Sequence, residues 1–98
     1  MYQVETTEVF DVWLDSIKDA MTRKRLALRL RKAELGNLGD VKQVGEGVWE
    51  MREFFGPGWR MYYILQGAML IVMLGGGDKS SQSGDIAAAI KLAALFKE

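Results

Sequence analysis

Residues 48–82 read VWEMREFFGPGWRMYYILQGAMLIVMLGGGDKSSQ, and this stretch decides the fold. Val48–Phe55 and Trp59–Leu65 are rich in aromatic and β-branched side chains, a composition typical of strands. Gly56-Pro57-Gly58 lies between them and has the residues of a tight turn. The stretch therefore predicts a β-hairpin.

After this hairpin the chain predicts one more strand and a helix. Met69–Leu74 is continuously apolar, which indicates a central strand buried on both faces. We expect Gly75–Lys79 to leave the sheet. A last helix, capped by Ser80, Ser81 or Ser83, should then run to about Phe96 and pack back on the sheet.

Before the hairpin, the chain predicts a strand, two helices and a short strand. The strands are expected over Gln3–Glu5 and Val41–Val44, and the second helix over Met21–Leu35. Thr6 and Thr7 are N-cap residues for the first helix. Its apolar face follows the i, i+3, i+4, i+7 spacing of a helix and consists of Phe10, Trp13, Leu14 and Ile17.

The resulting order is β-α-α-β-β-β-β-α, which predicts an α+β domain. We expect an antiparallel twisted sheet with the N-terminal helical hairpin and the C-terminal helix on one of its faces. The 98 residues suit one domain, residues 1–98.

Histidine and cysteine are both absent from the chain, which limits its chemistry. Disulfides and thiolate metal sites are excluded, and a zinc site is not expected. The longest apolar run, 68–74, is too short to span a bilayer, and the N-terminus lacks the pattern of a signal peptide. These features favour a cytoplasmic protein without membrane contact, metal or small-molecule cofactor.

Charge is segregated although the net charge is zero. Residues 1–22 are mainly acidic, whereas residues 23–32 hold six basic side chains and no acid: Arg23, Lys24, Arg25, Arg29, Arg31 and Lys32. One interpretation is a solvated helix face that pairs with the first helix, through Asp15 or Asp19 with Arg23 or Arg29. The other is a surface for a partner or RNA.

The hairpin predicts which side chains share a sheet face. With a three-residue loop, Phe55 pairs with Trp59, Phe54 with Arg60, and Arg52 with Tyr62. Because side chains alternate along strands, Arg52, Phe54, Arg60 and Tyr62 then lie together on the open face. Guanidinium groups match phosphate oxygens and RNA bases stack on aromatic rings, so this face could bind RNA. The alternative is a set of cross-strand pairs with Glu50 or Glu53 as ion-pair partner.

The glycine-rich segment GGGDK is a weaker signal. Such exits can form anion-binding nests, with Lys79 neutralising a phosphate, but they are more often plain turns. The Walker pattern of a nucleotide-binding loop is absent.

Three segments together resemble the RelE/ParE superfamily of type II toxins, and most closely its HigB-like "addiction module killer protein" group. They read GNLGDVKQVGEGVWEMR, GPGWRMYY and GGDKSSQSGDIAAA and span residues 36–89. The resemblance implies a compact RelE-like fold and a toxin neutralised by a cognate antitoxin, often a helix-turn-helix protein. It also implies an mRNA endonuclease, frequently acting on the ribosome, that inhibits translation.

The resemblance also implies roles for individual residues. Arg60 matches the arginine that relatives use on the scissile phosphate, and Lys79 matches the basic residue after the last strand. We take Arg60, Lys79, Arg52 and Tyr62 as candidate catalytic residues, and Lys42, Phe54, Gln82 and Asp85 as candidate RNA-binding residues. The reaction would be metal-independent: the 2′-OH attacks the adjacent phosphate and leaves a 2′,3′-cyclic phosphate.

The chain departs from the family pattern in ways that keep alternatives open. Glu50 and Glu53 lie on the middle strand, where ribosome-dependent relatives usually carry lysines. The general base is unassigned, with Tyr62, Lys79 and Asp85 as candidates. The alternative functions are a ParE-like inhibitor of DNA gyrase and an inactive toxin-fold protein that only binds its antitoxin.

Overall fold

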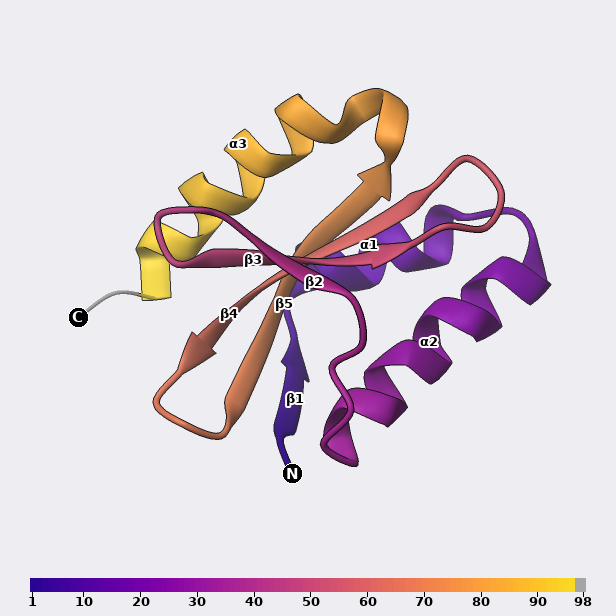
Figure 1. Ribbon diagram of the computed structural model, residues 1–98. Helices are drawn as coiled ribbons and strands as arrows, with labels where there is room; N and C mark the ends of the chain where they lie inside the picture. Colours follow the sequence, from indigo (N-terminus) through magenta and orange to yellow (C-terminus); the bar gives the residue numbers. More distant parts are fainter. Residues whose placement is uncertain (97–98) are drawn as a thin grey trace.

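The predicted hairpin lies at the centre of a five-stranded sheet in the computed structural model, which describes residues 1–96 (Figure 1). The strand order is β1-β5-β4-β3-β2. The strands are β1 Gln3–Thr6, β2 Val41–Gly45, β3 Val48–Glu53, β4 Trp59–Gln66 and β5 Leu70–Asp78.

The sheet is mixed, so the expectation of a wholly antiparallel sheet is wrong. Strands β2 to β5 form an antiparallel meander, but β1 runs parallel to β5. The cause is the helical hairpin, which carries the chain from β1 to the far edge of the sheet. The four antiparallel strands β2 to β5 then lead back across the sheet, so that β5 lies beside β1 and runs parallel to it.

Three helices complete the predicted element order, which is confirmed. They are α1 Glu8–Ser16, α2 Ala20–Glu34 and α3 Gln82–Ala93, with 3₁₀ turns at Lys79–Ser81 and Ala94–Phe96. Thr7 caps α1 by accepting a 3.2 Å hydrogen bond from the Phe10 N–H, and Asp19 caps α2. No helix within residues 1–96 is both long and apolar enough to cross a membrane.

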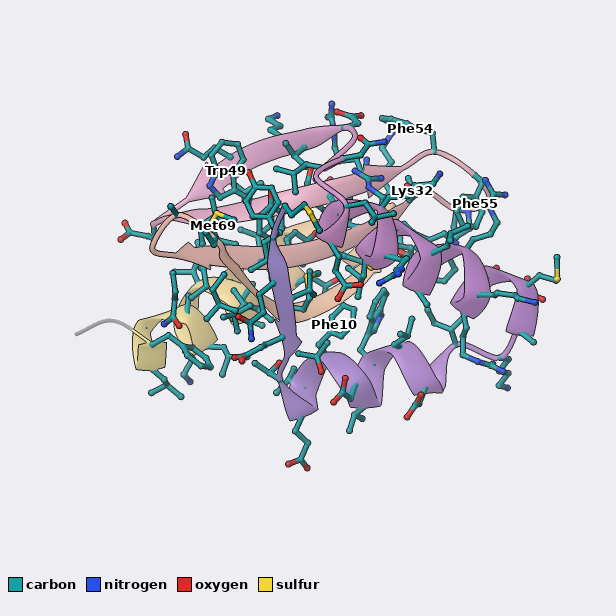
Figure 2. All side chains as sticks on the ribbon, turned by 90° about the horizontal axis from the view of Figure 1, so that it is seen from below. Phe10, Lys32, Trp49, Phe54, Phe55 and Met69 are labelled. Atoms are coloured by element: carbon teal, nitrogen blue, oxygen red, sulfur yellow. The ribbon has the colours of Figure 1, made fainter. Side chains whose placement is uncertain are left out.

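The helices cover both faces of the sheet. On one face, α1 and α2 bury Phe10, Ile17, Leu26 and Ala33 against side chains that include Met51, Met61 and Tyr63 (Figure 2). On the other, α3 packs Ala89 and Ala93 against Val48, Tyr62, Ile64, Val72 and Leu74. The expectation of helices on one face only is therefore wrong, because β3, β4 and β5 carry apolar side chains on both sides and both must be buried.

The hairpin register differs from the prediction by two residues. Arg52 pairs with Arg60, Glu50 with Tyr62 and Glu53 with Trp59. The loop is longer than expected, since β3 ends at Glu53 and β4 begins at Trp59. A shift of two keeps every side chain on its face, so the prediction that Arg52, Arg60 and Tyr62 share a face is confirmed while their pairing is wrong.

The glycine segment belongs to β5, so the expectation that it leaves the sheet is also wrong. Gly75, Gly76, Gly77 and Asp78 pair in turn with residues of β4 from Tyr62 back to Trp59. A Cβ atom on Gly76 would lie 2.5 Å from the Trp13 ring, and one on Gly77 would lie 1.9 Å from an Asp85 oxygen. Glycine is needed here because α1 and α3 place side chains directly against the strand.

Candidate functional site

Two arginines flank an exposed aromatic ring at the end of the hairpin. Arg52 and Arg60 are directly opposite on β3 and β4, and their guanidinium carbons lie 5.5 and 5.7 Å from the centre of the Phe54 ring. Phe54 is 68% exposed because it begins the loop, where no neighbouring strand covers it. Arg52 is 30% exposed and Arg60 only 6%, so the arrangement offers one accessible and one buried guanidinium beside a surface on which a base can stack.

Lys79 lies close to this pair. A Cβ atom on Gly58, in the hairpin loop, would be 3.6 Å from the Lys79 Cβ and 3.7 Å from Arg60 Nη1. Arg60 Nη1 and the base of the Lys79 side chain therefore lie against the same glycine, and Lys79 is exposed in the 3₁₀ turn that follows β5. Lys42 is exposed on β2, opposite Glu50. We call Lys42, Arg52, Phe54, Arg60 and Lys79 the cationic face.

Glu50 lies at the centre of these residues, and the predicted alternative in which Glu50 is an ion-pair partner of a hairpin arginine is confirmed for Arg60, although no binding or catalytic role was predicted for Glu50. It is 1% exposed, its Oε1 lies 3.7 Å from Arg60 Nε, and its Oε2 accepts a 3.0 Å hydrogen bond from Gln82 Nε2. The signal was present in strand alternation, because Glu50 is two residues from Arg52 and shares its face.

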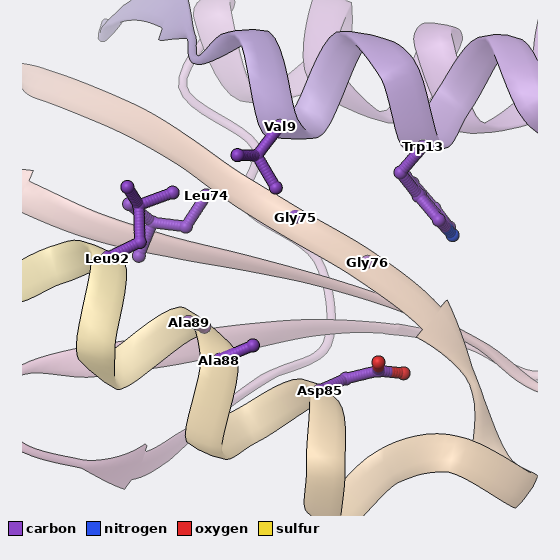
Figure 3. A pocket seen from close by; sticks show the side chains of 9 residues that line it. All are labelled: Val9, Trp13, Leu74, Gly75, Gly76, Asp85, Ala88, Ala89 and Leu92. Carbon is purple, nitrogen blue, oxygen red and sulfur yellow. The ribbon is translucent and has the colours of Figure 1, made fainter.

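Asp85 is the one candidate RNA-binding residue that points elsewhere. Its Oδ2 accepts a 2.5 Å hydrogen bond from Ser81 Oγ, and its carboxylate faces Trp13 across β5 (Figure 3). It contributes to a groove on the outer edge of the sheet. The structure therefore places Gln82 next to Glu50 but places Asp85 at the outer edge of the sheet.

Tyr62 is fully buried, so the expectation that it lies on an open face is wrong. Its side chain is 0% exposed beneath α3, and its hydroxyl has no hydrogen-bond partner within residues 1–96. Burial, reinforced by the charges of Glu50 and Asp85, raises the pKa of the Tyr62 phenol well above its ordinary value. In this structure Tyr62 cannot touch a bound phosphate or act as a base, and we assign it a packing role.

The basic helix α2 divides into residues with different roles. Arg29 is only 7% exposed and forms an ion pair with Glu53 instead of the acidic residues of α1. Arg23 donates a hydrogen bond to the Ile17 carbonyl, and Arg25 lies 3.6 Å over the Phe55 ring. Neither sequence interpretation describes Arg29, which connects α2 to the β2–β3 end of the sheet.

Arg29 also supports the cationic face. Its guanidinium donates to the carbonyls of Leu38, Asp40 and Arg52. The Asp40 carboxylate in turn accepts a 3.1 Å hydrogen bond from Arg52 Nη2. The buried arginine thereby fixes the backbone on both sides of the Arg52–Asp40 ion pair.

Comparison with known proteins identifies one relative without a described function. A protein of Haemophilus influenzae, described as an uncharacterized protein, is 40% identical over 91 residues, which are 93% of this chain and 92% of that protein. The chain belongs to the same family as this protein. No family model matches the chain. Function must therefore be argued from the site.

The chemistry available at the cationic face is that of fixed cations. Within residues 1–96, no group of three or more acidic side chains is placed to hold a metal ion. The face can bind phosphate oxygens with Arg52, Arg60 and Lys79 and can stack a base on Phe54. Glu50 adds a carboxylate that orients Arg60.

Proposed function

We propose that this chain is the toxin of a type II toxin–antitoxin pair, a RelE/HigB-like mRNA endonuclease acting in the cytoplasm. The observation that carries the proposal is the placement of Arg52 and Arg60 beside the exposed ring of Phe54, with the base of the Lys79 side chain next to Gly58 in the same hairpin loop. Single-stranded RNA is bound by cations that follow its phosphates and by rings on which its bases stack. The proposed partners are mRNA, the ribosome and a cognate antitoxin, such as a helix-turn-helix protein.

In the proposed reaction, the 2′-OH attacks the adjacent phosphate and the 5′-oxygen leaves. Arg60 stabilises the negative charge that develops on the phosphorane through its guanidinium, whose Nε lies 3.7 Å from Glu50 Oε1 and makes no hydrogen bond within residues 1–96. Phe54 stacks a neighbouring base, and Arg52 and Lys79 hold flanking phosphates so that the attack is in line. The group that removes the 2′-OH proton is left unassigned.

A second candidate is a toxin-fold protein that binds its partners without cutting RNA. The observation that favours it is the burial of Arg60, which is 6% exposed and ion-paired with the nearly inaccessible Glu50. In that case, Arg60 and Glu50 would form a structural pair, and only the outer cations would contact a ligand.

Expression without a partner protein, followed by mapping of RNA 5′ ends, separates these candidates. We expect growth arrest and new mRNA ends from the wild-type chain, and neither from Arg60→Ala. Arg31→Ala is the matched control, because Arg31 is a 67% exposed arginine on α2 away from the hairpin. Absence of both growth arrest and new ends would favour the second candidate, and growth arrest without new ends would contradict RNA cleavage. Full toxicity of a folded Arg60→Ala protein would remove the proposed role of Arg60.

Binding of a labelled single-stranded RNA to purified protein tests the surface itself. Phe54→Ala should weaken binding by about 1–3 kcal/mol, because a stacked base loses its platform. Phe54 is largely exposed, so its truncation should leave the unfolding temperature nearly unchanged. Arg52→Ala should also reduce the salt dependence of binding, since one phosphate contact is lost. Unchanged affinity in both variants would contradict the proposed surface.

A further inference from the structure

The outer edge of β5 is only half covered by β1. Strand β1 pairs with β5 from Leu70 to Met73, and the chain then turns into α1. Thr7 marks this point, because its N–H and its hydroxyl both donate to the Met73 carbonyl, at 3.1 and 2.9 Å. From Leu74 to Asp78, β5 has β4 on one side and no strand on the other within residues 1–96.

A groove runs along this uncovered edge. Two hollows of about 250 and 330 Å³ lie side by side there and share Trp13, Gly76 and Asp85 in their linings. Helix α1 forms one wall with Val9 and Trp13, and α3 forms the other with Asp85, Ala88 and Leu92, as Figure 3 shows. We call this feature the edge groove.

The floor of the edge groove is nearly bare backbone. Gly75, Gly76 and Gly77 line it without side chains of their own, but Trp13 lies against Gly76 and Asp85 against Gly77, so another chain can approach only along the edge of the strand. A strand edge presents peptide N–H and C=O groups, which an extended segment can pair with as an added strand. The glycines themselves accommodate Trp13 and Asp85, whereas the unpaired edge lies open between two helical walls. The shape therefore fits an extended peptide.

The charge around the edge groove indicates what kind of segment fits. Asp78 and Asp85 line the two hollows, and no lysine or arginine does. Helix α1 adds exposed carboxylates and has no basic residue between Glu8 and Ser16: Glu8, Asp11 and Asp15. Lys91 lies further along α3, in an adjoining hollow with Leu95. This surface repels phosphate groups and attracts basic side chains.

We propose that the edge groove binds an extended, basic and apolar segment of another protein, which adds to β5 as a sixth strand. Its apolar side chains would contact Val9, Trp13 and Leu92, and its basic side chains would approach Asp78 and Asp85. A second copy of this chain fits poorly, because twofold pairing of two β5 edges brings acidic residues against acidic residues. The proposal is independent of RNA cleavage at the cationic face.

Selection from a displayed library of random dodecapeptides tests this proposal on the full-length protein. We expect the selected peptides to alternate Lys or Arg with β-branched residues and to lack proline at the paired positions. Val9→Lys places bulk and positive charge at the groove wall, where Val9 is 55% exposed. Val12→Lys is the matched control, because Val12 is 62% exposed on the same helix but does not line the groove.

A synthetic peptide of the selected sequence should bind Val9→Lys at least about tenfold more weakly than wild type, and Val12→Lys within about twofold. On binding, the backbone amides of Gly76 and Asp78 should exchange with solvent more slowly. Acidic or proline-rich selected peptides, failure to select any peptide, or equal binding to both variants would overturn the proposal. A wild-type homodimer that Val9→Lys converts to monomer would assign the groove to a second copy and would also overturn it.

The same experiment keeps the two proposals apart. Arg60→Ala should bind the selected peptide as wild type does, whatever it does to growth arrest or RNA ends. A peptide whose binding is lost with Arg60→Ala and retained with Val9→Lys would contact the cationic face, and that result would overturn the edge groove as its site.

Discussion

Replacement of Arg29 by methionine should destabilise the protein much more than the same replacement of an exposed arginine on α2. Methionine keeps most of the aliphatic volume of arginine but none of its hydrogen-bond donors. Arg29 is 7% exposed and pairs with Glu53, while its guanidinium donates to the carbonyls of Leu38, Asp40 and Arg52 at 2.9, 2.7 and 2.9 Å.

The size of the effect follows from what the substitution leaves behind. Removing one partner of a buried ion pair costs about 3–5 kcal/mol, because the other charge stays desolvated. Glu53 is 23% exposed and can recover part of its hydration, so the lower end, about 3 kcal/mol, applies. Hydrogen bonds from charged donors contribute about 1.5–3 kcal/mol each but do not add independently within one network. A loss of about 3 kcal/mol lowers the unfolding temperature by about 12 °C or more.

Urea unfolding followed by circular dichroism measures this loss. Arg31→Met is the matched control on the same helix, because Arg31 is 67% exposed and its 3.3 Å ion pair with Glu34 is solvated. The control should change the free energy of unfolding by less than about 0.5 kcal/mol. If Arg29→Met stays within about 1 kcal/mol of Arg31→Met, the guanidinium network does not hold α2 to the sheet, and the reasoning is refuted.

Three further substitutions test separate contacts. Tyr62→Phe removes a buried hydroxyl that has no hydrogen-bond partner within residues 1–96, so the free energy of unfolding should stay unchanged or rise by about 1 kcal/mol. Growth arrest should be retained, and its loss in a stable variant would restore a catalytic role for Tyr62. Gly39→Ala should cost at least about 1 kcal/mol more than Gly67→Ala in urea unfolding. Both glycines have φ +66°, but only at Gly39 would the new Cβ meet Arg29, at 2.9 Å, and equal losses would contradict this contact. Burial raises the pKa of Tyr63 to about 12, so above pH 10 the unfolded chain binds fewer protons and the free energy of unfolding falls. The part due to Tyr63 is at most about 2.7 kcal/mol by pH 12, at about 1.36 kcal/mol per pH unit. Because the pKa of the buried Tyr62 is raised as well, Tyr63→Phe should reduce the fall without abolishing it, and an undiminished fall in Tyr63→Phe would contradict the contribution of Tyr63.

Local sequence patterns were sufficient to predict the order of helices and strands and the sheet face on which the hairpin side chains lie. The turn residues at 56–58, the threonine cap of α1 and the apolar spacing of Phe10, Trp13 and Ile17 each act over a few residues. Strand alternation then placed Arg52 and Arg60 on one face. This prediction survived an error in loop length, because the register changed by two and not by one.

Contacts between distant segments could not be predicted from local sequence patterns. GGGD has the composition of a turn, and only the approach of Trp13 and Asp85 from two helices explains why glycines lie in a strand. Arg29 has the sequence surroundings of a solvated basic helix. Its burial depends on how α2 meets the 38–40 segment, which lies nine or more residues further along the chain. Tertiary packing decided both positions, and it overrides local propensity.

The two arginines beside Phe54 are suited to different tasks because their acidic partners differ in exposure. Asp40 is 40% exposed, so water screens its attraction to Arg52, and a phosphate can replace it at little cost. Glu50 is 1% exposed, and its field on Arg60 is hardly screened. Much of the charge of Arg60 is therefore already balanced, and Arg60 attracts a distant phosphate weakly. Such a group contributes most when additional negative charge develops within hydrogen-bond distance, as it does in a phosphorane. The buried glutamate, which looked unfavourable for an RNA-binding strand, thus assigns ground-state binding to Arg52 and transition-state stabilisation to Arg60 in the proposed reaction.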